Sequence, residues 1–196
     1  MVVNTVVMAA ESTCLSCMAD SQPDLPPRER VYVGPRWRVA HAFGTELPGW
    51  LVVFPRRHVV ALDELTAAEA ADLGPLLRDV SCALRKVTLC EKTYVALFAE
   101  AEGFEHIHFH LIPRHANLDH ELRGPRVFGL LGGDPARNVP DSVMDQIAVA
   151  IAAALPAALT SIYDPDHRPT GADAPRALRS QIDMQDPKLM LTWSPA

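Results

Sequence analysis

The chain has 196 residues, a length that suits one domain with additional terminal segments. Hydrophobic residues make up 48% and charged residues 21%, which excludes wholesale disorder and provides enough apolar material for a core. The 18 Lys and Arg against 24 Asp and Glu give a net charge of −6. We therefore expect no nucleic-acid partner and no attraction to an anionic membrane, so any phosphate must be bound locally.

Neither end of the chain predicts a targeting or membrane segment. Residues 1–12 lack a basic stretch followed by an apolar run and a cleavage site. The longest apolar run, 147–160, is shorter than the roughly 18 residues that a membrane span needs. We therefore expect a soluble, cytoplasmic protein.

In a reducing compartment, a close pair such as Cys14 and Cys17 is more often a metal or redox site than a disulfide.

Composition divides the chain into three parts. Residues 1–30 combine the Cys14-Leu15-Ser16-Cys17 knuckle with a Pro-rich stretch, which predicts an irregular arm. The folded domain is expected over residues 31–160. Residues 161–196 are rich in proline and show no sustained periodicity, so they are expected to form an irregular or disordered tail.

Within the domain, β-type composition interrupted by Gly and Pro predicts strands over 31–33, 37–43 and 50–54. Two further strand candidates, 93–99 and 106–112, are joined by a short loop and are typical of an antiparallel hairpin. Pro113 is expected to end the second of them.

Two helices are predicted between and after these strands. Thr66 and Glu69 have the spacing of a capping box, and apolar residues then recur at helical spacing as far as Val87, with a kink expected at Pro75. A second helical pattern covers 140–155. The expected fold class is α+β, an antiparallel sheet with a long helix and a C-terminal helix.

Three histidines alternate with apolar residues in the segment His106-Ile107-His108-Phe109-His110-Leu111-Ile112. In a strand, residues two apart point to the same side about 6.6 Å apart, so the three imidazoles would share one face. His106 and His110 would then lie about 13 Å apart, which excludes one metal ion bound by all three. A neutral imidazole is a nucleophile and a proton carrier near neutral pH. The row therefore indicates group transfer, and the alternative is a strand with a solvated histidine face.

This segment resembles the signature of the histidine triad family, His-φ-His-φ-His-φ-φ with φ apolar. The flanks are similar too: a strand, a proline and two arginines lead to His58, and Ile112-Pro113-Arg114 follows the triad. The resemblance extends over about residues 14–115 and implies a HIT-like α+β fold that binds nucleotides, in most members as a homodimer.

The resemblance also implies a reaction. His108 would attack the α-phosphorus of a nucleotide and form a nucleotidyl-histidine intermediate, and His110 and His106 would complete the catalytic set. Nucleotide contacts are implied at His41, Gly103 and Phe104. The implied activity is that of a nucleotide phosphohydrolase or nucleotidyl transferase acting on dinucleoside polyphosphates or nucleoside phosphoramidates.

One stretch departs from the family pattern. Family hydrolases commonly carry Gly-Gln-(Ser or Thr)-Val just before the triad, whereas residues 101–104 here are Ala-Glu-Gly-Phe. The Gln and the hydroxyl that help to hold phosphate are missing, and Glu100, Glu102 and Glu105 add negative charge. The alternative is therefore a non-catalytic nucleotide- and zinc-binding module with the same fold.

Zinc-bearing members of the family bind the metal with two cysteines of an N-terminal knuckle, the histidine of the Pro-x-x-His stretch and the first triad histidine. Cys14, Cys17, His58 and His106 fill these positions. The resemblance therefore implies a closed, structural Cys₂His₂ zinc site. Reduced free thiols or a redox pair are the alternatives for Cys14 and Cys17, and Cys82 and Cys90 are expected to be ordinary core or strand-edge residues.

Overall fold

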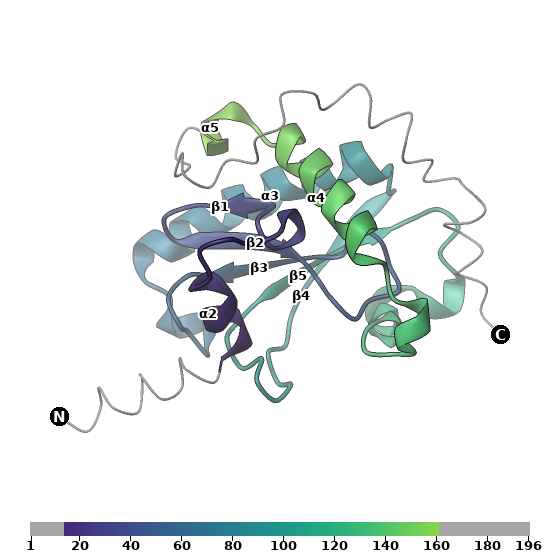
Figure 1. Ribbon diagram of the computed structural model, residues 1–196, viewed down its shortest axis with the longest axis horizontal. Helices are drawn as coiled ribbons and strands as arrows, with labels where there is room; N and C mark the ends of the chain where they lie inside the picture. Colours follow the sequence, from purple (N-terminus) through teal and green to yellow (C-terminus); the bar gives the residue numbers. More distant parts are fainter. Residues whose placement is uncertain (1–13, 161–196) are drawn as a thin grey trace.

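The computed structural model describes residues 14–160 and shows a five-stranded sheet in which every neighbouring pair is antiparallel (Figure 1). The strand order is β1-β2-β3-β5-β4. The strands are β1 (Tyr32–Val33), β2 (Trp37–His41), β3 (Leu51–Pro55), β4 (Lys92–Leu97) and β5 (Phe109–Arg114). The expected hairpin is confirmed as β4 and β5, and the expected α+β class is confirmed.

Four α-helices accompany the sheet in the described residues: α2 (Leu15–Asp20), α3 (Ala67–Thr88), α4 (Asp141–Ala154) and α5 (Ala157–Thr160). The capping box of α3 is present, since Thr66 accepts a hydrogen bond from the amide of Glu69 and the Glu69 carboxylate accepts one from the amide of Thr66. The helix continues through Pro75 to Thr88. The residue Pro140 is the N-cap of α4.

Strand register and the alternation of side chains along each strand show which residues share a face of the sheet. Val39 pairs with Val53, which pairs with Phe109, and these residues belong to one buried core with the apolar stripes of α3 and α4. On the other face, Ala40 pairs with Val52, which pairs with His110. Helices α3 and α4 therefore cover one face of the sheet and leave space for a site on the other.

The strand that carries the triad starts later than predicted. β5 begins at Phe109, so His106 and His108 precede the strand, and the prediction of three imidazoles on one strand face was wrong. The amide of Ile107 donates to the carbonyl of Val59, at 2.8 Å, outside the ladder between β3 and β5. Pro113 does not end the strand, because β5 runs to Arg114 along β4 where β3 is no longer its partner.

The N-terminal arm is more regular than its composition predicts. Within the expected arm 1–30, residues 15–20 form α2 and residues 27–29 form a short 3₁₀-helix. Residues 1–13 and the predicted tail 161–196 lie outside the described residues.

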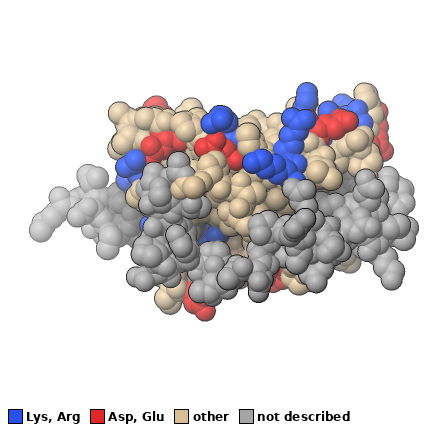
Figure 2. Space-filling model, turned by 90° about the horizontal axis from the view of Figure 1, so that it is seen from above, with Lys and Arg blue, Asp and Glu red and all other residues tan. Residues whose placement is uncertain are grey.

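The described surface is mixed in charge. On the face seen from above in Figure 2, basic and acidic side chains are interspersed over the described part of the molecule. Among residues 14–160, none of the helices combines the length and hydropathy needed to cross a bilayer.

Candidate catalytic and metal site

His108 lies half-buried just before β5 with a defined protonation pattern. Its Nδ1 is 2.9 Å from the backbone carbonyl oxygen of His106. A carbonyl only accepts, so Nδ1 carries the proton and donates it, which leaves the lone pair of the neutral ring on Nε2. An imidazole with Nδ1–H bound and Nε2 free is a nucleophile that needs no further deprotonation.

His110 has the opposite tautomer. The indole N–H of Trp50 donates to Nδ1 of His110 at 3.0 Å, so the proton of the neutral ring is on Nε2. Burial, with a smaller contribution from the charge of His108, lowers the pKa of His110 to about 4. The rings of His108 and His110 are 4.7 Å apart at an interplanar angle of 75°. A lone pair and an N–H donor are therefore placed side by side.

Both imidazoles line a cavity of about 530 Å³ over the sheet face opposite α3 and α4. Its floor is formed by small and apolar residues of β2 and β3, including Ala40 and Val52. Five phenylalanines line it: Phe43, Phe54, Phe98, Phe104 and Phe128. We call this space the ligand cavity. Its size and aromatic lining are those of a site for a planar organic group.

Four of these phenylalanines form two pairs of neighbouring rings. The rings of Phe43 and Phe104 are 5.5 Å apart, and those of Phe98 and Phe128 are 5.1 Å apart. Phe43 and Phe98 remain 58% and 59% exposed, so apolar surface is available to a ligand at the opening.

Of the three residues predicted to contact a nucleotide besides the triad, two line the ligand cavity and one does not. Phe104 lines the ligand cavity as expected. His41 also lines it, but Nδ1 donates to the carbonyl of Ala42 at 2.7 Å and Nε2 accepts from the amide of Gly49 at 2.9 Å. Both ring nitrogens are thus occupied, which leaves no imidazole nitrogen for a ribose hydroxyl. Gly103 is not among the lining residues and instead contacts Leu15 of α2 through its carbonyl oxygen.

The acidic residues before the triad do not surround the imidazoles. Glu102 and Glu105 are exposed and are not among the lining residues, whereas Glu100 is exposed and lines the ligand cavity. Of these three carboxylates, only that of Glu100 therefore lines the ligand cavity, where Glu29 of the short 3₁₀-helix adds another acidic side chain.

Sequence reasoning missed two polar partners of this site. Trp50 gives no local sign of a polar role in the sequence, and its indole N–H orients His110. Arg38 is only 1% exposed, lines the ligand cavity and forms ion pairs with Asp20 and Glu29. The alternation of side chains along β2 could have indicated that Arg38 faces the site, because it lies on the same sheet face as Ala40.

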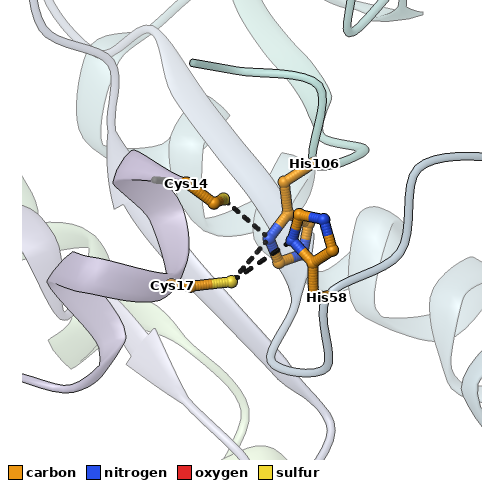
Figure 3. Close-up of side chains that lie close together, drawn as sticks. All are labelled: Cys14, Cys17, His58 and His106. Atoms are coloured by element: carbon orange, nitrogen blue, oxygen red, sulfur yellow. Dashed lines mark hydrogen bonds between the residues drawn. The ribbon is translucent and has the colours of Figure 1, made fainter. Parts of the chain in front are cut away.

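A second cluster lies behind α2. Cys14 and Cys17 project from the start of this helix toward His58 and His106 (Figure 3). Both cysteine sulfurs are 3.5 Å from Nδ1 of His106, and the Cys17 sulfur is 3.4 Å from Nδ1 of His58. We call these four residues the metal cluster.

The donor set of the metal cluster fits a tetrahedral ion. One ligand atom per residue lies within 4.8 Å of the other three. Sulfur and nitrogen at zinc–ligand distances of about 2.3 and 2.1 Å in a tetrahedron are about 3.6 Å apart, close to the observed separations. Two thiols and two imidazoles are the ligands that zinc prefers. The cluster can therefore hold such an ion.

The other two cysteines differ in their exposure to solvent. Cys90 is buried, as expected, but Cys82 is exposed on α3, so its assignment to the core or a strand edge was wrong. Cys82 lies on the solvent side of the α3 stripe, whose Val80, Ala83 and Leu84 are the residues that reach the core.

Known proteins were compared with this chain. The family model of the HIT domain matches residues 26–117, which include the triad segment. A zinc-bound histidine triad family protein from Mycobacterium smegmatis is 19% identical, with a TM-score of 0.54 and coverage of 77% of this chain and 98% of that one. A hypothetical histidine triad nucleotide-binding protein from Sulfolobus tokodaii is 14% identical, with a TM-score of 0.55 and coverage of 72% and 91%.

A structure of a uridylyltransferase is 22% identical, with a TM-score of 0.52, and covers 78% of this chain and 50% of that one. No curated protein matches the sequence significantly. At these identities the solved structures support the fold, and the family model identifies the domain. Residues 26–117 of this chain are a HIT domain, the domain of the histidine triad family.

Proposed function

We propose that this protein is a nucleotide phosphohydrolase or nucleotidyl transferase that acts through His108. The observation that carries the proposal is the complementary pair of tautomers at the ligand cavity. His108 presents an Nε2 lone pair, and His110 presents an Nε2–H donor beside it. A nucleophile next to a donor for a phosphate oxygen is the arrangement that phosphoryl displacement needs.

In the first step, Nε2 of His108 attacks the α-phosphorus of the substrate. The P–Nε2 bond forms, the bond from phosphorus to the leaving oxygen or nitrogen breaks, and the leaving group takes a proton from solvent. The ring becomes cationic, and the carbonyl of His106 stabilises it through Nδ1–H. His110 donates Nε2–H to a phosphate oxygen.

In the second step, a water molecule attacks the same phosphorus and releases a proton to solvent, the P–Nε2 bond breaks with its electron pair returning to Nε2 of His108, and a nucleoside monophosphate leaves. If another nucleoside phosphate replaces water, the same site performs transfer. The aromatic walls of the ligand cavity, including Phe43 and Phe104, would hold the base by stacking.

The second candidate is a nucleotide- and zinc-binding module without turnover. Residues 101–104 lack the Gln and the hydroxyl of family hydrolases, and Glu100 lies at the ligand cavity. We favour the enzyme because the tautomers of His108 and His110 are both fixed for attack, which binding alone does not require.

We further propose that the metal cluster holds one structural zinc ion. Four protein ligands complete a tetrahedral shell, and Cys14 is buried while Cys17 and His58 are half-buried. The zinc would tie α2 to the segment before the triad. The zinc-bound protein from Mycobacterium smegmatis supports this choice of metal.

The test is intact-mass spectrometry after mixing the protein with an adenosine phosphoramidate. We expect a nucleotidyl adduct on His108 in a rapid quench, and its absence together with loss of turnover in His108→Asn. His120→Asn is the matched control, because His120 is exposed at the surface. His110→Ala should lower both rate and affinity, and His106→Ala should mainly remove metal. Adduct formation by His108→Asn at the native rate would refute the mechanism, and tight binding without turnover would favour the module.

A further inference from the structure

The short helix α2 separates the metal cluster from the ligand cavity. Cys14 and Cys17 point from it toward the two histidines of the metal cluster (Figure 3). Leu15, Ser16 and Ala19 line the ligand cavity. Consecutive residues of one helix therefore belong to two different sites.

Packing alone does not hold α2 in this position. The helix has six residues, and none of them is fully buried. Isolated helices of this length are unstable in water. The position of α2 therefore depends on a few specific contacts at its two sides.

The contacts on the cavity side are polar. The amide of Leu15 donates to the carbonyl of Gly103 at 3.3 Å, which connects α2 to the loop that carries Phe104. The buried guanidinium of Arg38 donates to the carbonyl of Ser16 at 3.4 Å and pairs with Asp20 at 3.2 Å. If α2 moved away, Arg38 would lose these two partners at the wall of the ligand cavity.

A second connection runs through His106. Its imidazole Nδ1 belongs to the metal cluster, and its backbone carbonyl accepts the hydrogen bond from Nδ1–H that fixes the tautomer of His108. An ion that holds the His106 side chain therefore also restrains the carbonyl that orients His108.

The metal cluster has its own opening to solvent. A separate open hollow of about 450 Å³ is lined by Cys17, Met18, His58 and neighbouring polar residues. It shares none of these residues with the ligand cavity. A chelator can therefore reach the metal without entering the space that a ligand occupies.

We propose that α2 couples the two sites, so that metal binding assembles one wall of the ligand cavity and a bound ligand in turn strengthens metal binding. This inference rests on the proposed zinc and nucleotide binding. The contacts of Leu15, Arg38 and the carbonyl of His106 transmit the coupling. Nucleotide affinity therefore depends on zinc occupancy.

Equilibrium binding tests the coupling in both directions. The affinity for zinc is measured by competition with a chelator, with and without saturating adenosine 5′-monophosphate. The affinity for adenosine 5′-monophosphate is measured by calorimetry with and without zinc. Because linkage is reciprocal, we expect both affinities to rise by the same factor, about tenfold. A factor of one in both directions would overturn the proposal.

Two variants on α2 provide a matched pair. Leu15→Ala shortens a side chain that lines the ligand cavity and should reduce the coupling factor toward one. Met18→Ala shortens a side chain of similar size that lines the outer hollow and should leave the factor unchanged. Equal coupling factors in the two variants would contradict the proposal that the coupling acts through the cavity face of α2.

Hydrogen exchange separates this inference from the proposed function, because it needs no nucleotide. Removal of zinc should accelerate amide exchange over 15–20 and over the cavity wall 98–104, and leave α4 unchanged. Acceleration confined to 15–20 would overturn the coupling even if nucleotide binds. Failure of adenosine 5′-monophosphate to bind the zinc-loaded protein, with the expected exchange pattern, would count against the nucleotide proposal and retain the coupling.

Discussion

The indole N–H of Trp50 and Nδ1 of His110 form a buried hydrogen bond of 3.0 Å between β5 and the residue preceding β3. Trp50 is fully buried, and its ring also packs edge-on against Phe128, so the donor has little freedom to turn away. The bond decides which nitrogen of His110 carries the proton, and thereby gives the ligand cavity a donor where a phosphate oxygen would develop charge.

Trp50→Phe should therefore slow nucleotidyl transfer. The variant keeps an aromatic ring but removes the donor, so His110 can adopt either tautomer and the rate should fall roughly tenfold. Single-turnover kinetics measure the rate, and ¹⁵N chemical shifts of the imidazole report the tautomer. Trp37→Phe is the matched control: its indole N–H donates to the carbonyl of Glu69 on the helix side of the sheet. Equal rate losses in the two variants would show that the bond to His110 is not responsible.

Metal content should depend on two cysteines and not on a third. We expect about one zinc per chain, and Cys14→Ser or Cys17→Ser should lose it together with about 2 kcal/mol or more of unfolding free energy. Cys82→Ser should keep the metal, because Cys82 is exposed on α3. Elemental analysis and urea unfolding measure the two quantities. Full zinc retention in the double variant of Cys14 and Cys17 would disprove the assignment.

The burial of His41 makes stability depend on pH. Burial lowers the pKa of His41 to about 4, from a reference value of 6.5. Between these values the unfolded chain takes up a proton that the folded chain does not, so stability is present above pH 6.5 and is lost as the pH falls toward 4. The contribution is about 3 kcal/mol at most.

Urea unfolding between pH 4 and pH 7 tests this contribution by comparing the native chain with His41→Phe. The variant leaves the carbonyl of Ala42 and the amide of Gly49 unpaired, so it should be less stable at pH 7, but its stability should fall less steeply with acid. His120→Phe should parallel the native curve, since His120 is exposed. Parallel curves for all three proteins would argue against a neutral, buried His41.

An edge of the sheet predicts self-association. β4 is the last strand in the order, and Val95 on it and Phe98 just after it are 51% and 59% exposed. Unpaired strand edges with apolar side chains associate readily, so we expect a homodimer through β4. Val95→Lys should shift the protein to monomer in sedimentation velocity, whereas Lys92→Glu at the start of the strand should have a smaller effect. A monomer at all concentrations of the native chain would refute the prediction.

Several features of this protein follow from the sequence alone because they depend on local order. The spacing of Thr66 and Glu69 predicts the start of α3, since a capping box involves only neighbouring residues. The alternation of histidines and apolar residues leads to the resemblance to the HIT family, and that resemblance, not the knuckle alone, implies a metal cluster of Cys14, Cys17, His58 and His106. Its four ligand atoms do lie together, although up to 92 positions separate them in the chain.

Only the tertiary structure decided that the three triad imidazoles do not share one face: His106 belongs to the metal cluster, whereas His108 and His110 line the ligand cavity. Period alone predicts one face for all three imidazoles, but Ile107 bonds to Val59 instead of joining the ladder, and His106 turns toward the metal cluster. The roles of Trp50 and Arg38 likewise depend on strand register and on where α2 packs. Hydrogen bonds between segments 60 residues apart carry no local signal, because they form only when the whole sheet is assembled.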